Sequence, residues 1–204
     1  MVQEQFESQA QATGTPDALR QATAARHGAI DSLLGLRSPF GRTHYGRVLQ
    51  GFEAFLTVWE PRMARALPPH LQPWFAATAR SALARRDLEA LGLPTVPAAA
   101  CVPSLDAWPD ALGSLYVLEG SALGGQYIAA QARRHLGLSA AHGAAYFHGC
   151  GTATVERWRG FQRLLAAELD ADPVAQAQAV RGAVATFDGL IATFDSLLHE
   201  RAAA

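Results

Sequence analysis

The sequence predicts an all-α fold in a single domain. Apolar residues recur at helical spacing along most of the chain, and no stretch shows the alternation with hairpin turns that is typical of β-strands. The chain has 204 residues, 50% of them hydrophobic, which suits one domain with a substantial core. Residues 1–14 are polar and aperiodic, so we expect a disordered N-terminal tail before a domain over 15–204.

Local signals predict where the first two helices begin and end. Thr15-Pro16-Asp17 supplies an N-cap, a proline at the first helical position and an acid in the first turn, which predicts a helix over 15–34. A second helix is predicted from Thr43, with a kink at Pro61, and Pro68-Pro69 closes it.

The rest of the chain follows the same helical pattern. A proline-interrupted loop and a Gly- and His-containing connector separate its apolar stretches. We predict further helices over 71–91, from Ser104 or Asp106 to about Leu136, through Trp158 to Leu165, and from Asp172-Pro173 through Leu197.

Composition argues against several function classes. A formal net charge of -1 lacks the broad basic surface that a nucleic-acid binder needs. The first residues lack a secretory signal pattern and no apolar run is long enough to span a bilayer, so we expect a cytoplasmic protein with no membrane partner. Cys101 and Cys150 form no CxxC or haem-attachment motif, which favours reduced, structural thiols.

One histidine of the first helix shares a face with apolar residues. A step of about 100° per residue places His27 in the stripe of Leu19, Thr23, Ile30 and Leu34, so we expect it to point inward. It is then either a core histidine with one hydrogen bond or a metal ligand. Asp31, one turn on, could accept the other imidazole N–H, and Arg20 lies about 10 Å back along the axis. This spacing suits a flat ligand with a central metal and an anionic edge.

Glycines interrupt the fourth predicted helix in the stretch "LEGSALGGQ". Each costs about 1 kcal/mol in a helix interior relative to alanine. Gly113, Gly120 and Gly124 fall on one stripe, and Ser121 and Gly125 form a neighbouring one. Two explanations stay open: close packing of another helix, or a planar ligand lying against the backbone, with a kink at the glycine pair.

Two of these segments resemble a known family. "LRQATAARHGAIDSLL" is similar to the proximal helix, and "LYVLEGSALGGQY" to the distal helix, of biliverdin-producing haem oxygenases of the bacterial type associated with bacteriophytochromes. The resemblance covers about residues 16 to 200. It implies a helical bundle that holds haem between a proximal helix and a kinked distal helix, with His27 as the iron ligand.

The resemblance also implies an activity and a set of site residues. Haem b would be both substrate and cofactor, cleaved to biliverdin, CO and ferrous iron by O2 and external electrons. The implied catalytic surface is Gly120, Ser121, Gly124 and Gly125, and further haem contacts are Arg20, Arg159, Arg163 and Phe187. Arg159 and Arg163 also fit a solvated basic face. Many members carry an aspartate where this chain has Ser121, which has no charge to organise water.

The implied partners follow from the same resemblance. No flavin or nicotinamide fingerprint is present, so the electrons would come from a ferredoxin, a reductase or a similar donor. A bacteriophytochrome would receive the product. Three other hypotheses stay open: a haem carrier or sensor of the same fold, a thiaminase-like protein with a reactive thiol, and a helical interaction module whose glycines serve packing alone.

Overall fold

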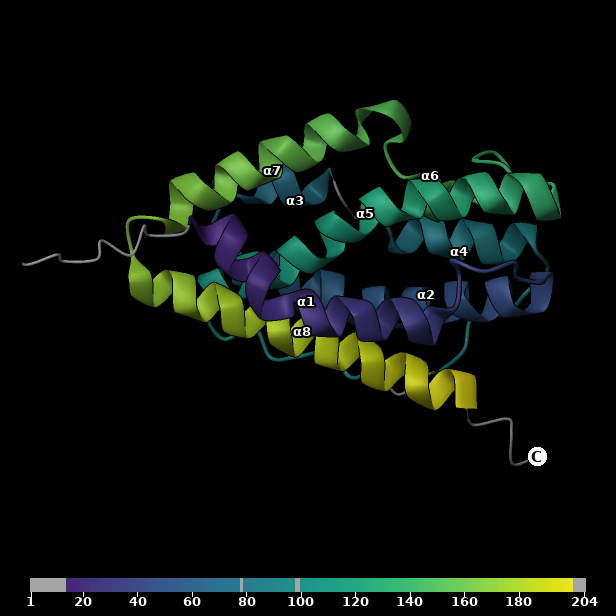
Figure 1. Ribbon diagram of the computed structural model, residues 1–204, viewed down its shortest axis with the longest axis horizontal. Helices are drawn as coiled ribbons and strands as arrows, with labels where there is room; N and C mark the ends of the chain where they lie inside the picture. Colours follow the sequence, from purple (N-terminus) through teal and green to yellow (C-terminus); the bar gives the residue numbers. More distant parts are fainter. Residues whose placement is uncertain (1–13, 78, 98–99, 200–204) are drawn as a thin grey trace, which may run out of the picture.

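Two long helices, α5 (Trp108–Leu136) and α8 (Pro173–His199), cross and pack against each other in the computed structural model (Figure 1). The structure describes residues 14–77, 79–97 and 100–199, in which no β-strand occurs, and this confirms the all-α prediction. The other helices in this part of the chain are α1 (Thr15–Leu34), α2 (Arg42–Ala66), α3 (Gln72–Ala76), α4 (Ser81–Ala90), α6 (Ala145–His148), the 3-10 helix η1 (Gly151–Ala153) and α7 (Thr154–Leu169). The predicted tail lies almost wholly outside the described residues.

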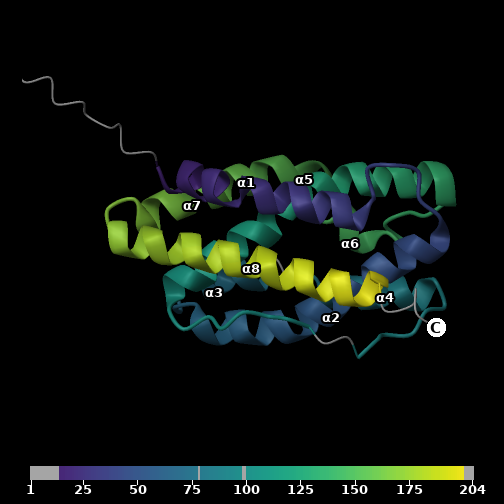
Figure 2. The same ribbon diagram turned by 60° about the horizontal axis from the view of Figure 1, so that its bottom comes forward.

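Helix α8 runs along one side of the bundle (Figure 1). In Figure 2 it runs between α1 and α2, and both of these helices contact it. Its crossing with α5 is very close, because a Cβ added to Gly113 would lie 1.7 Å from the Ala179 carbonyl oxygen. A Cβ on Gly182 would likewise lie 2.0 Å from the Asp110 carbonyl oxygen. Helix packing therefore explains Gly113, one of the glycines of the predicted stripe.

The predicted helix ends are mostly confirmed. Gly35 closes α1 in the left-handed conformation, at φ 61°. Asp172 caps α8 by accepting the backbone N–H of Val174 at 2.9 Å. The N-cap of α1 is Gly14 rather than Thr15, because the backbone N–H and hydroxyl of Thr15 donate to Asp170 Oδ1 instead, at 2.8 and 2.6 Å.

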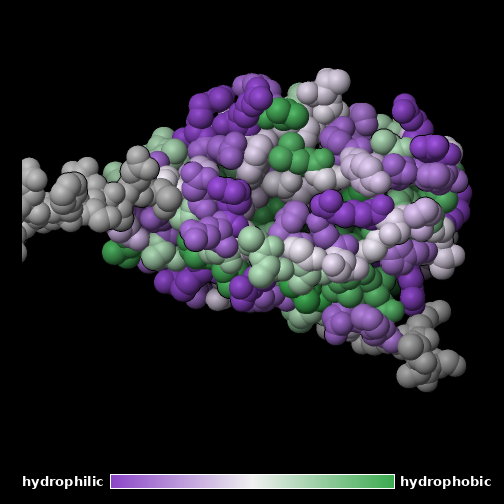
Figure 3. Space-filling view, in the orientation of Figure 1, coloured by the Kyte–Doolittle hydropathy of each residue, from purple (hydrophilic) through white to green (hydrophobic). Residues whose placement is uncertain are grey.

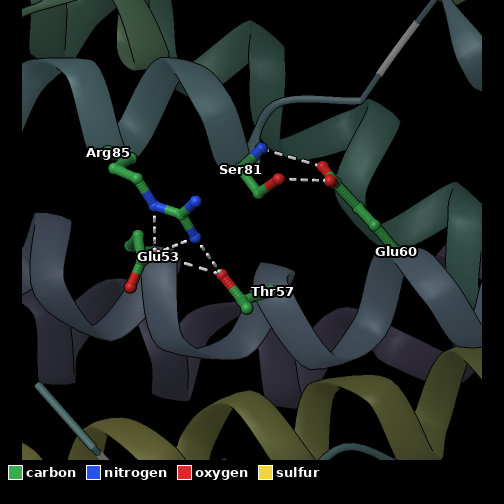
Figure 4. A network of polar contacts seen from close by, with 5 residues as sticks. All are labelled: Glu53, Thr57, Glu60, Ser81 and Arg85. Carbon is green, nitrogen blue, oxygen red and sulfur yellow. Dashed lines mark hydrogen bonds and ion pairs between the residues drawn. The ribbon is translucent and has the colours of Figure 1, made fainter. Parts of the chain in front are cut away.

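The single helix predicted over 71–91 is wrong: the segment forms two helices, α3 and α4. A carboxylate of α2 starts α4, because Glu60 Oε1 accepts the backbone N–H groups of Arg80 and Ser81 at 2.6 and 2.8 Å. The other oxygen of Glu60 accepts the Ser81 hydroxyl (Figure 4). Next to it, Arg85 donates to Glu53 and ties α4 to α2 a second time.

The connector after α5 also contains structure that the sequence did not predict. The buried carboxylate of Asp87, on α4, accepts the backbone N–H groups of Ala145 and Tyr146 at 2.9 and 2.7 Å and so starts α6. Burial raises the pKa of Asp87, and the two N–H donors only partly oppose this effect.

A buried set of hydrogen bonds joins α2, α5 and α8. Trp59 Nε1 donates to the Ser114 hydroxyl at 2.7 Å, and the Thr186 hydroxyl lies 2.6 Å from the same oxygen. Among the described helices, none combines the length and hydropathy that a bilayer span requires.

Candidate functional site

A cavity of about 540 Å3 lies between α1 and α5, within the usual size range for a small-molecule or cofactor site. Helix α1 lines one side and the glycine stretch of α5 lines the other, and rings from α6, α7 and α8 complete the wall. Figure 3 shows hydrophobic residues recessed between hydrophilic ones on this face of the molecule. The cavity therefore offers an apolar slot between two helices.

His27 lies on the α1 side of this cavity. Its side chain is 57% exposed, although Leu19 and Ile30 of the same stripe are buried. The edge of Phe187, on α8, faces the imidazole at 6.1 Å between ring centroids. His27 is thus no core histidine with a satisfied hydrogen bond, because its ring is open to the cavity.

The carboxylate expected beside His27 is present but occupied. Asp31 Oδ2 accepts from Arg37 Nη2 at 2.6 Å and from Arg37 Nε at 3.1 Å. His27 Nδ1 lies 3.6 Å from the same oxygen, which is beyond hydrogen-bond distance. The sequence analysis missed Arg37, which follows the end of α1 and whose carbonyl oxygen accepts the Tyr127 hydroxyl of α5 at 3.3 Å.

The glycines of α5 serve two purposes. A Cβ on Gly124 would meet no atom within 4 Å, and one on Gly120 would make only ordinary contact with Trp158, at 3.5 Å. A Cβ on Gly125 would lie 2.9 Å from the Phe147 carbonyl oxygen. Packing against α6 therefore accounts for Gly125, whereas Gly120 and Gly124 leave room on the cavity side.

The predicted arginines are divided. Arg20 lines the cavity and pairs with Asp17 at 3.1 Å in an exposed position. Arg159 and Arg163 lie on α7 and are not among the residues that line the cavity, and Arg163 pairs with the exposed Glu156 at 3.2 Å. The structure therefore brings together Arg20, His27, the glycine stretch and Phe187, and leaves these two arginines aside.

A cation that the sequence analysis missed lies beside Ser121. The Ser121 hydroxyl donates to the Leu118 carbonyl oxygen at 2.8 Å, and Arg80 Nη2 donates to the same oxygen. The Arg80 guanidinium also stacks 5.5 Å from the ring centroid of Tyr146. Burial raises the pKa of Tyr146 to about 12, so this phenol stays neutral. The break between α3 and α4 positions Arg80 here, which no local pattern indicated.

These features can bind a flat, largely apolar ligand. A single histidine facing a surface without side chains suits an iron held within a planar ring, because such an iron takes its ligands above and below the ring. No cluster of three or more potential metal ligands occurs in the part of the chain that the structure describes.

Comparison with known proteins agrees with this geometry. A family model described as "Heme oxygenase" matches residues 15–196. The chain belongs to the haem oxygenase family. Among curated relatives, the heme oxygenase of Xanthomonas campestris pv. campestris is 37% identical over 147 residues, 72% of this chain and 81% of the relative. The heme oxygenase PigA of Pseudomonas aeruginosa is 30% identical over 149 residues, 72% of this chain and 75% of the relative.

Solved haem oxygenase structures share the fold. The NO- and CO-bound heme oxygenase of Neisseria meningitidis superimposes with a TM-score of 0.74 and 25% identity, over 90% of this chain and 92% of that one. Heme oxygenase 2 of Chlamydomonas reinhardtii, solved without heme, gives a TM-score of 0.72 at 18% identity, over 91% of this chain and 98% of that one. The chain is a haem oxygenase, and the thiaminase-like and interaction-module hypotheses are set aside.

Proposed function

We propose that the protein binds haem b as its substrate in the cavity between α1 and α5, with His27 on the iron. In this proposal it cleaves haem to biliverdin, CO and ferrous iron with O2 and external electrons. The observation that carries the proposal is the open space between His27 and the surface of Gly120 and Gly124, where an added Cβ would meet only Trp158 or no atom within 4 Å.

The side chains around this space support the chemistry of oxygen on haem. A neutral histidine pushes less electron density toward the iron than a thiolate does, which favours oxidation of the ring over O–O cleavage. On the opposite side, O2 would bind in the volume that Gly120 and Gly124 leave open. Arg80 would hold water there by N–H donation, and the Ser121 oxygen, whose proton goes to the Leu118 carbonyl oxygen, would hold it by accepting an O–H.

Arg20 is the best placed of the predicted arginines for the haem propionates, because it already lines the cavity and its Asp17 partner is exposed. Arg159 and Arg163 would reach the propionates only if their side chains moved across the surface of α7. Propionate contacts fix the rotation of haem in its plane, and this rotation selects the meso carbon that is cleaved.

The proposal also includes the partners. Haem cleavage consumes electrons, and none of the residues that line the cavity can supply them, so a ferredoxin, a reductase or a similar cytoplasmic donor would act from outside. The biliverdin would serve a bacteriophytochrome as its chromophore. The resemblance of the proximal and distal helices to haem oxygenases of that type supports this destination.

Turnover separates an oxygenase from a haem carrier. Equimolar hemin is added to the purified protein, and spectra are recorded before and after a reductant such as ascorbate is supplied under air. We expect a sharp Soret band that decays into the broad red absorption of biliverdin. A Soret band that persists with ascorbate, and then with a ferredoxin and its reductase, would contradict the oxygenase activity and leave a carrier.

A further inference from the structure

A second cavity, of about 220 Å3, shares two lining residues, Arg80 and Ala122, with the main cavity. Residues of α4, α5 and α7 and the segment around Cys150 line the rest of it, and we name it the rear cavity. It is open to solvent where Ala79 and Cys150 are exposed, and it reaches the buried Thr154. The rear cavity therefore has room for a ligand of its own.

Arg80 is a half-buried cation without a counter-ion. Its guanidinium has five N–H donors, and its contacts are the Leu118 carbonyl oxygen and the ring of Tyr146. No carboxylate of the described residues lies within ion-pair distance of this guanidinium. Glu60, which is close by, accepts the backbone N–H groups of Arg80 and Ser81 instead. Because a buried charge without a partner is costly, this position favours a bound anion.

A second guanidinium in the same wall is already fixed in place. Arg157 Nε lies 3.2 Å from Glu119 Oε2, and Arg157 Nη2 donates to the Trp74 carbonyl oxygen at 3.1 Å. The group also stacks 4.6 Å from a ring centroid of Trp74. Glu119 thus balances Arg157, and the positive charge of Arg80 remains as the net charge of the cavity wall.

The remaining wall describes the body of the ligand. Ala77, Leu83 and Ala122 offer methyl groups. The Thr154 hydroxyl, 4% exposed, accepts from Gln126 Nε2 at 3.2 Å, and its own proton has no acceptor among the described residues. A carboxylate suits both the planar guanidinium and this O–H, and a short carbon chain suits the methyl groups. Inorganic phosphate would leave the methyl groups facing water.

We propose that the rear cavity binds a small organic monocarboxylate, with its charged end on the Arg80 guanidinium and its carbon chain against Leu83 and Ala122. The site goes beyond the proposed function, because neither haem nor O2 enters the rear cavity. The two cavities are nevertheless coupled, since the guanidinium that holds the carboxylate also lines the main cavity.

Butyrate is the probe for this site, and butyramide is its uncharged counterpart of nearly the same shape. Binding to the haem-free, full-length protein is measured by saturation-transfer NMR of the ligand and by the rise in melting temperature with ligand concentration. We expect butyrate to bind roughly tenfold or more tightly than butyramide, because only butyrate pairs with the charge. Absence of butyrate binding, or equal binding of butyramide, would overturn the proposal. Phosphate that binds more tightly than butyrate would overturn the assignment of an organic ligand.

Two variants place the ligand within the protein. Leu83→Trp fills the rear cavity from α4 without reaching a residue of the main cavity, and Arg80→Leu removes the cation. Each should weaken butyrate binding by roughly tenfold or more. Val174→Trp, which adds the same side chain at an exposed position of α8, is the control and should leave the affinity unchanged.

Wild-type butyrate affinity in each of these variants that keeps the wild-type melting temperature would put the ligand elsewhere and overturn the site. Because haem is absent from these measurements, that result leaves the proposed function standing. Failure of the unmodified protein to form a Soret band with hemin would overturn the proposed function and leave the carboxylate site standing.

Discussion

Arg37 donates two hydrogen bonds to one oxygen of Asp31, at 2.6 and 3.1 Å, and His27 Nδ1 lies 3.6 Å from that same oxygen. The arginine and the histidine therefore compete for one carboxylate. A second partner on the Nδ1 side of a metal-bound histidine fixes the ring orientation and sets how basic the ligand is. Because Arg37 already binds Asp31, this carboxylate can orient the His27 ring and raise its basicity only weakly.

In the proposed haem complex, with His27 on the iron, removal of Arg37 should strengthen this ligand. In Arg37→Ala, Asp31 can turn to accept the imidazole N–H, and a more basic histidine stabilises ferric over ferrous haem. A hydrogen bond worth about 1 kcal/mol corresponds to a fall in reduction potential on the order of 40 mV. Spectroelectrochemical titration of the haem complex measures it. Arg26→Ala, next to His27 on α1, breaks an exposed pair with Asp188 of α8 and should not change the potential; an equal fall in both variants would contradict the competition.

The two purposes of the α5 glycines predict opposite effects of substitution. Gly124→Leu places its side chain in open space, so we expect no loss of thermal stability but a fall of at least tenfold in hemin affinity. Gly125→Ala presses on the Phe147 carbonyl oxygen 2.9 Å away, so we expect a lower melting temperature. Calorimetry and hemin titration of both variants separate these effects. Tight hemin binding by Gly124→Leu would place the ligand elsewhere.

The buried hydroxyl of Ser114 should matter more for stability than its size suggests. Ser114→Ala leaves Trp59 Nε1 without its buried acceptor, and such a loss costs about 1–3 kcal/mol. Urea denaturation gives this free energy of unfolding. Ser32→Ala, at an exposed hydroxyl that donates to the Gly28 carbonyl oxygen, is the matched control and should change the free energy by less than about 0.5 kcal/mol. Equal effects of the two substitutions would argue against the buried network.

The raised pKa of Asp87 predicts a pH dependence of stability. A folded-state pKa above the unfolded value means that the native state holds this proton more tightly. The stabilisation is therefore complete below the unfolded pKa, and it is lost as the pH rises through the folded-state pKa. We expect the melting temperature of the wild type, relative to Asp87→Asn, to fall between about pH 4 and neutral pH. A rise over this range would mean that the N–H donors of Ala145 and Tyr146 outweigh burial.

The sequence predicted those parts of the fold and site that are set by residues close to one another along the chain. Periodicity and the helix-ending Gly35 predicted α1, and the same spacing placed His27 and Asp31 one turn apart. The parts it missed depend on contacts across the bundle. Glu60 divides one expected helix into α3 and α4, and that break brings Arg80 to the cavity. Spacing alone likewise did not show that Gly113 packs on α8 while Gly124 faces open space.

The most direct test of the account is the absorption spectrum of the hemin complex of His27→Ala, with and without added imidazole. We expect the variant to lose the sharp Soret band of a histidine-ligated haem and to lose turnover, and we expect imidazole, bound in the space that the side chain left, to restore both. His44→Ala is the control, because His44 Nε2 donates to the Leu34 carbonyl oxygen at 2.7 Å and His44 does not line the cavity. A wild-type spectrum and wild-type turnover in His27→Ala without imidazole would contradict the assignment of His27 as the iron ligand.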